Sequence, residues 1–133
     1  MIATGAASLK EVTRAVELLE SYGVPVVLMQ CNTNYTGSDD NFDYIHLNVL
    51  QNYKKMFPKV TLGLSDHTPG CVTVLGAISL GASVIEKHFT DDNLRVGPDH
   101  SFSMTPKSWR EMVDNARILE RSLGNFTKEV QDN

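Results

Sequence analysis

Residues 60–88 read VTLGLSDHTPGCVTVLGAISLGASVIEKH, and this segment indicates the fold class. Two short apolar runs, residues 60–64 and 83–87, predict buried strands because they are brief and rich in β-branched residues. Between them, residues 71–80 are apolar and rich in Ala and Gly, which we interpret as a short buried helix. A strand, a helix and a further strand in this order predict a unit with two parallel strands.

The same alternation continues towards the N-terminus of this segment. Ser8 and Glu11 form a capping-box pattern at the start of an amphipathic helix. The apolar run at residues 24–29 predicts the next strand, and the apolar spacing over residues 44–57 predicts a second amphipathic helix. Strands and helices are therefore predicted to alternate in the residues before 60–88 as well.

Both ends of the chain fit this alternation. Thr105 and Pro106 are typical of a helix start, and a polar tail follows the last helix at residues 125–133. Residues 1–3 resemble the end of a strand whose beginning is absent. We therefore expect an α/β fold of about four β/α units with a clipped first strand, formed by residues 1–124.

Parallel β/α units close into an eightfold barrel or remain an open sheet. Neither GxGxxG nor GxxxxGK[ST] occurs in the sequence, which disfavours the nucleotide-binding open sheets. A complete (β/α)₈ barrel takes about 250 residues, and this chain has 133. Its length leaves two alternatives, half of a barrel and a small open sheet.

Composition excludes several functional classes. The formal net charge is -4 and no basic stripe is present, so we expect no nucleic-acid partner. The longest apolar runs, residues 24–29 and 72–75, are too short to span a membrane. A secretory signal is not evident, and two cysteines do not make a disulfide scaffold. We expect a soluble cytoplasmic protein without a membrane partner.

Polar side chains follow the predicted strands at their carboxyl ends, where parallel β/α proteins have their active and binding sites. His67 and His88 end two adjacent strands, and neighbouring strands lie ~4.8 Å apart. Two imidazoles at matching heights could share one cation. Asp99, in the loop beyond, could supply a carboxylate or orient a water. In the alternative interpretation, each histidine is a hydrogen-bonded residue at the rim of the sheet.

Further polar residues at these strand ends are candidates for substrate contacts. Ser65 points to the same side as His67, where its hydroxyl could hold a phosphate or carboxylate oxygen or cap the next helix. Asn34 and Tyr35 could bind a polyol or satisfy the loop backbone. Asp66 points to the other side of the strand, and we expect a structural role for it.

Other reactive side chains have a structural interpretation. We expect Glu86 and Lys87 to pair with neighbouring strands, with a Schiff-base role for the lysine as the weaker alternative. Cys31 and Cys71 have no general base beside them in the sequence, so we interpret them as small core or rim residues. His46 falls in an amphipathic helix, where we expect it at the surface.

Taken together, these motifs resemble the sialic acid synthases, a family that includes N-acetylneuraminate synthase and its legionaminic and pseudaminic acid relatives. The resemblance covers nearly the whole chain. The motifs that carry it are GLSDHT at residues 63–68, EKHFT at 86–90 and GPDH at 97–100, with Thr4-Gly5 and residues 31–35 in support. Their order and spacing are specific, although each motif alone is weak.

The resemblance implies the C-terminal half of a catalytic (β/α)₈ barrel. It implies condensation of phosphoenolpyruvate with an N-acetylated hexosamine, such as N-acetylmannosamine, to a nine-carbon 2-keto sugar acid and phosphate. It implies a divalent metal on His67 and His88, usually Mn²⁺, with Mg²⁺ and Co²⁺ as alternatives. At the position of Asp99 it implies a carboxylate that orients or deprotonates a water or a sugar hydroxyl.

The resemblance also implies the substrate contacts. Ser65 and Asn34 match positions that contact phosphoenolpyruvate, Tyr35 matches one that contacts the sugar, and Thr4 lies in a further substrate-binding motif. Ala3 departs from the family pattern, which usually has Ser at this position.

We expect the chain to correspond to only part of such an enzyme. The first strands of the barrel and the small antifreeze-like domain have no counterpart in the sequence. Four β/α units cannot close a barrel, so we expect a homo-oligomer or pairing with a missing barrel half. We expect little or no synthase activity from the chain alone. The alternative function is a non-catalytic β/α module that oligomerises or binds metal or sugar; another metal-assisted aldolase fits the motifs less well.

Overall fold

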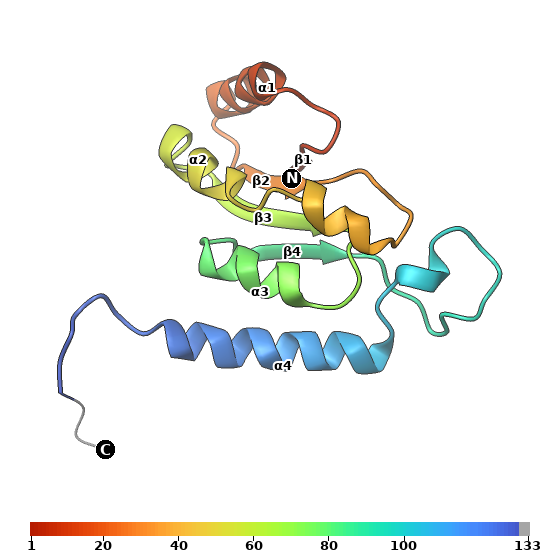
Figure 1. Ribbon diagram of the computed structural model, residues 1–133. Helices are drawn as coiled ribbons and strands as arrows, with labels where there is room; N and C mark the ends of the chain where they lie inside the picture. Colours follow the sequence, from red (N-terminus) through yellow and green to blue (C-terminus); the bar gives the residue numbers. More distant parts are fainter. Residues whose placement is uncertain (131–133) are drawn as a thin grey trace.

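The computed structural model describes residues 1–130, and strands alternate with α-helices throughout them (Figure 1). The sheet has the order β1-β2-β3-β4 and every pair of neighbours is parallel. This confirms the predicted β/α alternation. The elements are β1 (Ile2–Ala3), α1 (Leu9–Ser21), β2 (Val27–Cys31), α2 (Val49–Met56), β3 (Thr61–Asp66), α3 (Val72–Ser79), β4 (Val84–Lys87) and α4 (Pro106–Leu123), with 3₁₀ helices at Asp39–Tyr44 and His100–Phe102.

The register of the sheet aligns the carboxyl ends of its strands. In β3, Ser65 lies opposite Cys31 of β2 on one side and Glu86 of β4 on the other. The next residue, Asp66, lies opposite Lys87. The residues that follow β3 and β4 therefore leave the sheet at the same edge.

The hydrophobic core lies between the helices and one face of this sheet. Leu28 of β2 and Leu64 of β3 have no exposed surface, and they belong to one apolar cluster with Val16 of α1, Leu50 of α2 and Val74 of α3. Successive side chains of a strand point to opposite faces. The odd-numbered residues of β3, including Ser65, therefore face away from this core. In Figure 1, α1 and α4 lie at opposite ends of the molecule.

Helix α1 begins at the predicted capping box. The amide of Ser8 donates to the carboxylate of Glu11 at 2.8 Å, and the amide of Glu11 donates to the Ser8 hydroxyl at 3.4 Å. The hydrogen bonds from the Ser8 side chain and backbone lower the pKa of the Glu11 carboxyl. Helix α4 begins in the same way, with a reciprocal pair between Thr105 and Ser108 and a proline at its first position.

The prediction of a continuous helix over residues 44–57 was wrong. Helix α2 starts only at Val49, and a separate 3₁₀ helix ends at Tyr44. Between them, His46 has a positive φ of 46°, which an α-helix does not accommodate. His46 is exposed as expected, but it lies in a turn and not in a helix.

Two strands also differ from the predicted ranges. Strand β2 begins at Val27, after Pro25, whose ring nitrogen has no hydrogen to donate to a neighbouring strand. Strand β3 continues through Asp66, where a loop was predicted, because Ser65 and Asp66 both have partners in β4. Pairing with a neighbour extends a strand beyond its apolar run.

Residues 125–130 carry no regular secondary structure. Residues 125–130 of the predicted polar tail are exposed and belong to no helix or strand, and residues 131–133 lie outside the described residues. Within residues 1–130, none of the helices combines the length and the apolar character that a membrane crossing needs.

We predict that the core around Leu64 dominates stability. Replacing this fully buried residue in L64A removes apolar contacts and leaves a cavity, so the free energy of unfolding should fall by about 2 to 5 kcal/mol. The matched control is L94A, since Leu94 is 90% exposed. Urea unfolding followed by circular dichroism measures both variants, and equal midpoints would contradict this assignment of the core.

Candidate functional site

The structure brings His67 and His88 together at the carboxyl ends of β3 and β4. Their ring centroids lie 5.1 Å apart, and the rings are nearly perpendicular, at 73°. Each histidine directly follows the last residue of its strand, and those two last residues are register partners. The predicted juxtaposition of the two imidazoles is therefore present.

A backbone carbonyl fixes the orientation of the His67 ring. Nδ1 lies 2.7 Å from the carbonyl oxygen of Asn32, which follows β2. Because a carbonyl oxygen only accepts hydrogen bonds, Nδ1 must be the protonated nitrogen. The lone pair of Nε2 is then available to a metal ion or another donor. Sequence reasoning missed this role of Asn32 because a backbone carbonyl leaves no signature in residue identity.

Asp99 lies beside His88, in the loop that leads to the second 3₁₀ helix. The distance from Asp99 Oδ2 to His88 Nδ1 is 3.6 Å, slightly longer than a hydrogen bond. The Asp99 side chain is 49% exposed and that of His88 is 26% exposed. A carboxylate in this position can orient the imidazole and can also accept a proton from a molecule bound above it.

Two aromatic side chains surround the histidines. The ring of Tyr35 lies 4.2 Å from that of His67 and 5.5 Å from that of His88, and the ring of Phe102 lies 5.2 Å from that of His88. Gly37 packs directly on Phe102: a Cβ at this glycine would lie 2.6 Å from the phenylalanine Cβ. The loops after β2 and β4 therefore meet around the two imidazoles.

Ser65 lies on the same strand face as His67, as predicted. Its side chain is buried and donates a hydrogen bond of 3.0 Å to Glu86 Oε1. Glu86 is exposed and is two residues before His88, so both side chains belong to one face of β4. This confirms that Glu86 pairs with a neighbouring strand, and it adds a carboxylate to the site that sequence analysis did not assign there. The spacing of two residues between Glu86 and His88 could have predicted this position, because side chains two apart in a strand share one face.

Asp66 and Lys87 form a buried ion pair. Lys87 Nζ lies 2.7 Å from Asp66 Oδ2, and the two side chains are 2% and 0% exposed. The predicted pairing of Lys87 with a neighbouring strand is confirmed, and so is the structural position of Asp66. The lysine amine donates both to Asp66 and to the Thr68 carbonyl, on the face of the sheet opposite to the histidines.

Thr4 and Asn34 have partners within the fold. The buried Thr4 hydroxyl donates to the Met29 carbonyl at 3.0 Å and accepts from the Tyr53 hydroxyl at 3.2 Å. The Asn34 side chain accepts from the Thr36 amide at 3.1 Å, which forms a local turn. Their substrate contacts stay predictions.

The described residues supply a small set of metal ligands. Among residues 1–130, no three His, Cys, Asp or Glu side chains are arranged so that together they could hold a metal ion. His67 and His88 therefore offer two nitrogen donors, while the Asp99 carboxylate is directed at an imidazole. Such a site would need water, substrate or another chain to complete its coordination.

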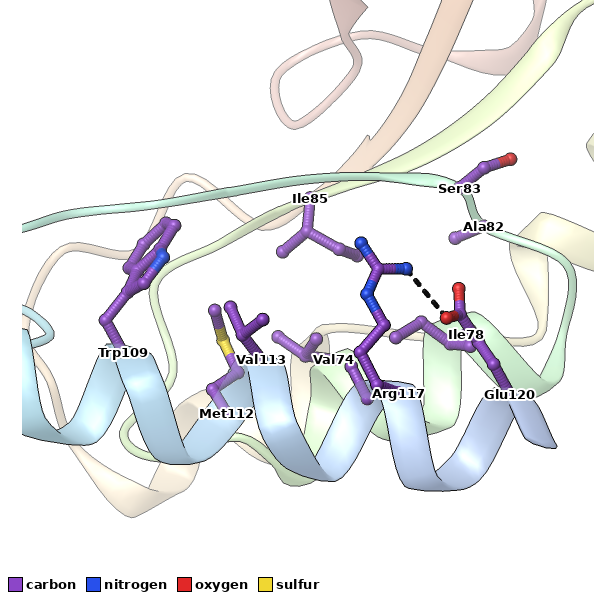
Figure 2. A pocket seen from close by; sticks show the side chains of 11 residues that line it. Val74, Ile78, Ala82, Ser83, Ile85, Trp109, Met112, Val113, Arg117 and Glu120 are labelled. Atoms are coloured by element: carbon purple, nitrogen blue, oxygen red, sulfur yellow. Dashed lines mark hydrogen bonds and ion pairs between the residues drawn. The ribbon is translucent and has the colours of Figure 1, made fainter. Parts of the chain in front are cut away.

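An apolar groove lies elsewhere, between α4 and the helix-facing side of β4 (Figure 2). Ile85 of β4 faces Trp109 and Val113 of α4 there, and an ion pair between Arg117 and Glu120 crosses one end. Ile85 points to the opposite face of β4 from the histidine that follows the strand. This groove is therefore separate from the imidazole pair.

Comparisons with known proteins agree in one family. The sequence profile of the NeuB family matches residues 1–128. The chain is 31% identical to human N-acetylneuraminate-9-phosphate synthase over 130 residues, covering 98% of this chain and 35% of that protein. It is 36% identical to the N,N'-diacetyllegionaminic acid synthase of Legionella pneumophila over 138 residues, covering 100% of this chain and 38% of that protein.

A solved structure matches as well. The crystal structure of N-acetylneuraminic acid synthetase from Leptospira borgpetersenii, in complex with citrate, has a TM-score of 0.86 and 29% sequence identity. The match covers 98% of this chain and 44% of that one. These similarities confirm the predicted α/β fold as part of a synthase barrel. The chain spans less than two fifths of the two curated relatives.

We predict that the two cysteines differ in reactivity. Burial raises the pKa of the Cys31 thiol, against a weaker lowering by hydrogen bonding with Ser65, so less thiolate is present at a given pH than for a free thiol. Cys71 is only half-buried. With Ellman's reagent at pH 8, Cys71 should react first. C71S should leave only the slow phase and C31S only the fast one; equal rates would contradict the prediction.

Proposed function

The chain belongs to the NeuB family of sugar-acid synthases, and from this premise we propose that it carries the metal-binding part of a condensing active site. The reaction joins phosphoenolpyruvate to an N-acylated hexosamine, such as N-acetylmannosamine, and yields a nine-carbon 2-keto sugar acid and phosphate. The observation that carries the proposal is the pair of imidazoles, 5.1 Å apart at the carboxyl ends of adjacent parallel strands.

Its relatives support this class of product. They include synthases of N-acetylneuraminate 9-phosphate, diacetyllegionaminic acid and pseudaminic acid. These compounds are sugar acids of one chemical type. The choice of phosphoenolpyruvate and of an N-acylated hexosamine for this chain follows from the resemblance of its GLSDHT, EKHFT and GPDH motifs to the sialic acid synthases.

The donor set suits a divalent transition metal. His67 presents Nε2 because its Nδ1 is bonded to a carbonyl, and the ring of His88 lies beside it. When bound, the ion would act as a Lewis acid on the sugar aldehyde. Mn²⁺ is the ion that the resemblance implies, whereas imidazole ligands alone should bind Co²⁺ more tightly. Mg²⁺ prefers oxygen ligands and fits this pair least well.

The carboxylate of Asp99 fits the role of a proton acceptor. In the proposed reaction, the enol carbon attacks the aldehyde, water adds at the former enol C2, and the tetrahedral intermediate releases phosphate. The Asp99 side chain is half-exposed beside the His88 ring, so a water or a sugar hydroxyl can reach it. We assign it the orientation or deprotonation of that group.

The remaining predicted contacts surround the same edge of the sheet. Tyr35 is half-exposed above the imidazoles, where its phenol can reach the sugar. Ser65 would redirect its hydroxyl from Glu86 towards phosphoenolpyruvate. Thr4 and Asn34 would bind substrate only by exchanging the partners that they have within the fold.

The chain alone is an incomplete site. Both β1 and β4 have one unpaired edge in the described residues, and the groove in Figure 2 lies beside β4. We propose that a missing barrel half or a second copy of the chain covers these edges. Because condensation depends on the assembled positioning of both substrates, the chain alone should show weak turnover or none.

The open edges also favour a second candidate function. A β/α module with unpaired strands and two imidazoles could oligomerise, or bind metal or sugar, without catalysing condensation. Restoration of turnover by an added N-terminal barrel half from a relative would favour the catalytic function. Metal binding without such restoration would favour the module.

We predict that the imidazole pair binds Mn²⁺ and Co²⁺. H67A and H88A should each lower the affinity by about tenfold or more, because one of two protein nitrogens is lost. H46N is the matched control: it removes an exposed imidazole, and Asn tolerates the positive φ at this position. Isothermal titration calorimetry gives the Co²⁺ affinity, and electron paramagnetic resonance titration gives the Mn²⁺ affinity. Equal affinities in all four proteins would remove the metal role.

We predict that the open edges cause association at micromolar concentration. Sedimentation velocity over a dilution series should show a dimer or a larger species that dissociates as the concentration falls. A stable monomer over the whole series would contradict pairing between copies and leave the missing barrel half as the partner.

A further inference from the structure

We infer that the buried ion pair between Asp66 and Lys87 is a positioning device that holds His67 and His88 side by side. The two charged side chains lie on the face of the sheet opposite to the imidazoles. Their role is to fix the backbone from which the two imidazoles project. The functional value of this device rests on the proposed metal site, but its structural effect can be tested without any metal.

The placement of the four residues carries the inference. Asp66 and Lys87 are register partners at the last paired positions of β3 and β4. Each directly precedes one histidine of the pair. A bond between the two charged side chains therefore fixes the relative height of the two residues that follow, with only one peptide unit between anchor and imidazole.

The carboxylate of Asp66 is saturated with donors. Oδ2 accepts from Lys87 Nζ at 2.7 Å and from the Thr73 hydroxyl at 2.6 Å, and Oδ1 accepts from the amide and hydroxyl of Thr68 at 3.0 and 2.9 Å. Thr73 lies in the first turn of α3. The network thus connects β3, β4 and the start of α3.

His67 lies between two anchored residues. Asp66 precedes it, and Thr68 follows it with its amide bonded to the same carboxylate. Lys87 Nζ donates a second hydrogen bond to the Thr68 carbonyl at 2.7 Å. The residues on both sides of His67 therefore belong to the buried network, which restrains the backbone from which the ring projects.

The ion pair and the imidazoles occupy opposite faces of the sheet. Asp66 contacts the hydroxyl of Thr73 on the helix side, whereas the next residue along the strand, His67, faces Tyr35. A substrate above the imidazoles has no access to the buried carboxylate or amine. These charges therefore act on the site through the backbone and through their electric field, and not by direct contact with a substrate.

Because both charges are buried, the ion pair adds little net stability to the fold. Removing two charges from water costs free energy that their attraction often only balances, and an apolar pair of similar volume is frequently as stable. A charged pair does, however, fix one register, because slipping the strands would leave each charge unpaired. This favours a role in alignment.

The test compares variants that remove the network with one that weakens the core elsewhere. The double variant D66N/K87M removes both charges at similar volume. T73V removes the hydroxyl that bonds to both Asp66 and Thr68, and T73S retains that hydroxyl. V16A weakens the core at a fully buried site on α1. Nuclear Overhauser contacts between the His67 and His88 rings, in the metal-free protein, report the positioning directly. Co²⁺ affinity and the visible spectrum of the bound ion report its consequence.

We expect D66N/K87M to lose the contact between the rings and to bind Co²⁺ about tenfold more weakly or worse, with an altered spectrum. T73V should weaken both the ring contact and the Co²⁺ affinity, and T73S should keep both close to those of the original chain. V16A should retain both while it is folded, as circular dichroism monitors. If D66N/K87M does not fold, T73V against T73S decides.

Two outcomes separate this inference from the proposed function. Variants that keep the ring contact and the Co²⁺ affinity of the original chain would overturn the positioning role. A parent chain that shows the ring contact but binds neither Co²⁺ nor Mn²⁺ would overturn the metal site, and loss of the ring contact in the variants would still support the positioning role.

Discussion

The parallel pairing of β3 with β4 is the constraint on which the site depends. It places Asp66 opposite Lys87 at the last paired position, and the attraction between these buried charges favours this register over others. The two histidines then leave the sheet at equal height, with their rings 5.1 Å apart. Without that register, the same residues would be two unrelated side chains at the rim of the sheet.

The sheet divides its side chains between two tasks. One face carries Leu28 and Leu64 into the core beneath the helices, where burial of apolar surface stabilises the fold. The other face carries Ser65 and Glu86, which are bonded to each other, towards the side where the imidazoles project. Stability and chemistry thus come from the same strands, and strand periodicity keeps them apart.

Much of this arrangement could be predicted from particular residues. The capping box of Ser8 and Glu11 and the start of α4 depend on neighbours within a few positions, so local sequence predicts them well. The continuous helix over residues 44–57 was predicted wrongly, because apolar spacing does not report the backbone turn at His46. Glu86 was predicted to pair with a neighbour, but its place beside the site depends on which strand that neighbour is.

The sequence by itself determined the order of strands and helices, the family, and the strand ends at which His67 and His88 lie. Local periodicity and specific motifs carry these properties, and they need no knowledge of distant contacts. Only the tertiary structure decided that the Asn32 carbonyl, 35 positions before His67, orients its imidazole, and that Tyr35 and Phe102 enclose the pair. Such contacts join segments far apart in the chain, and packing alone sets their distances.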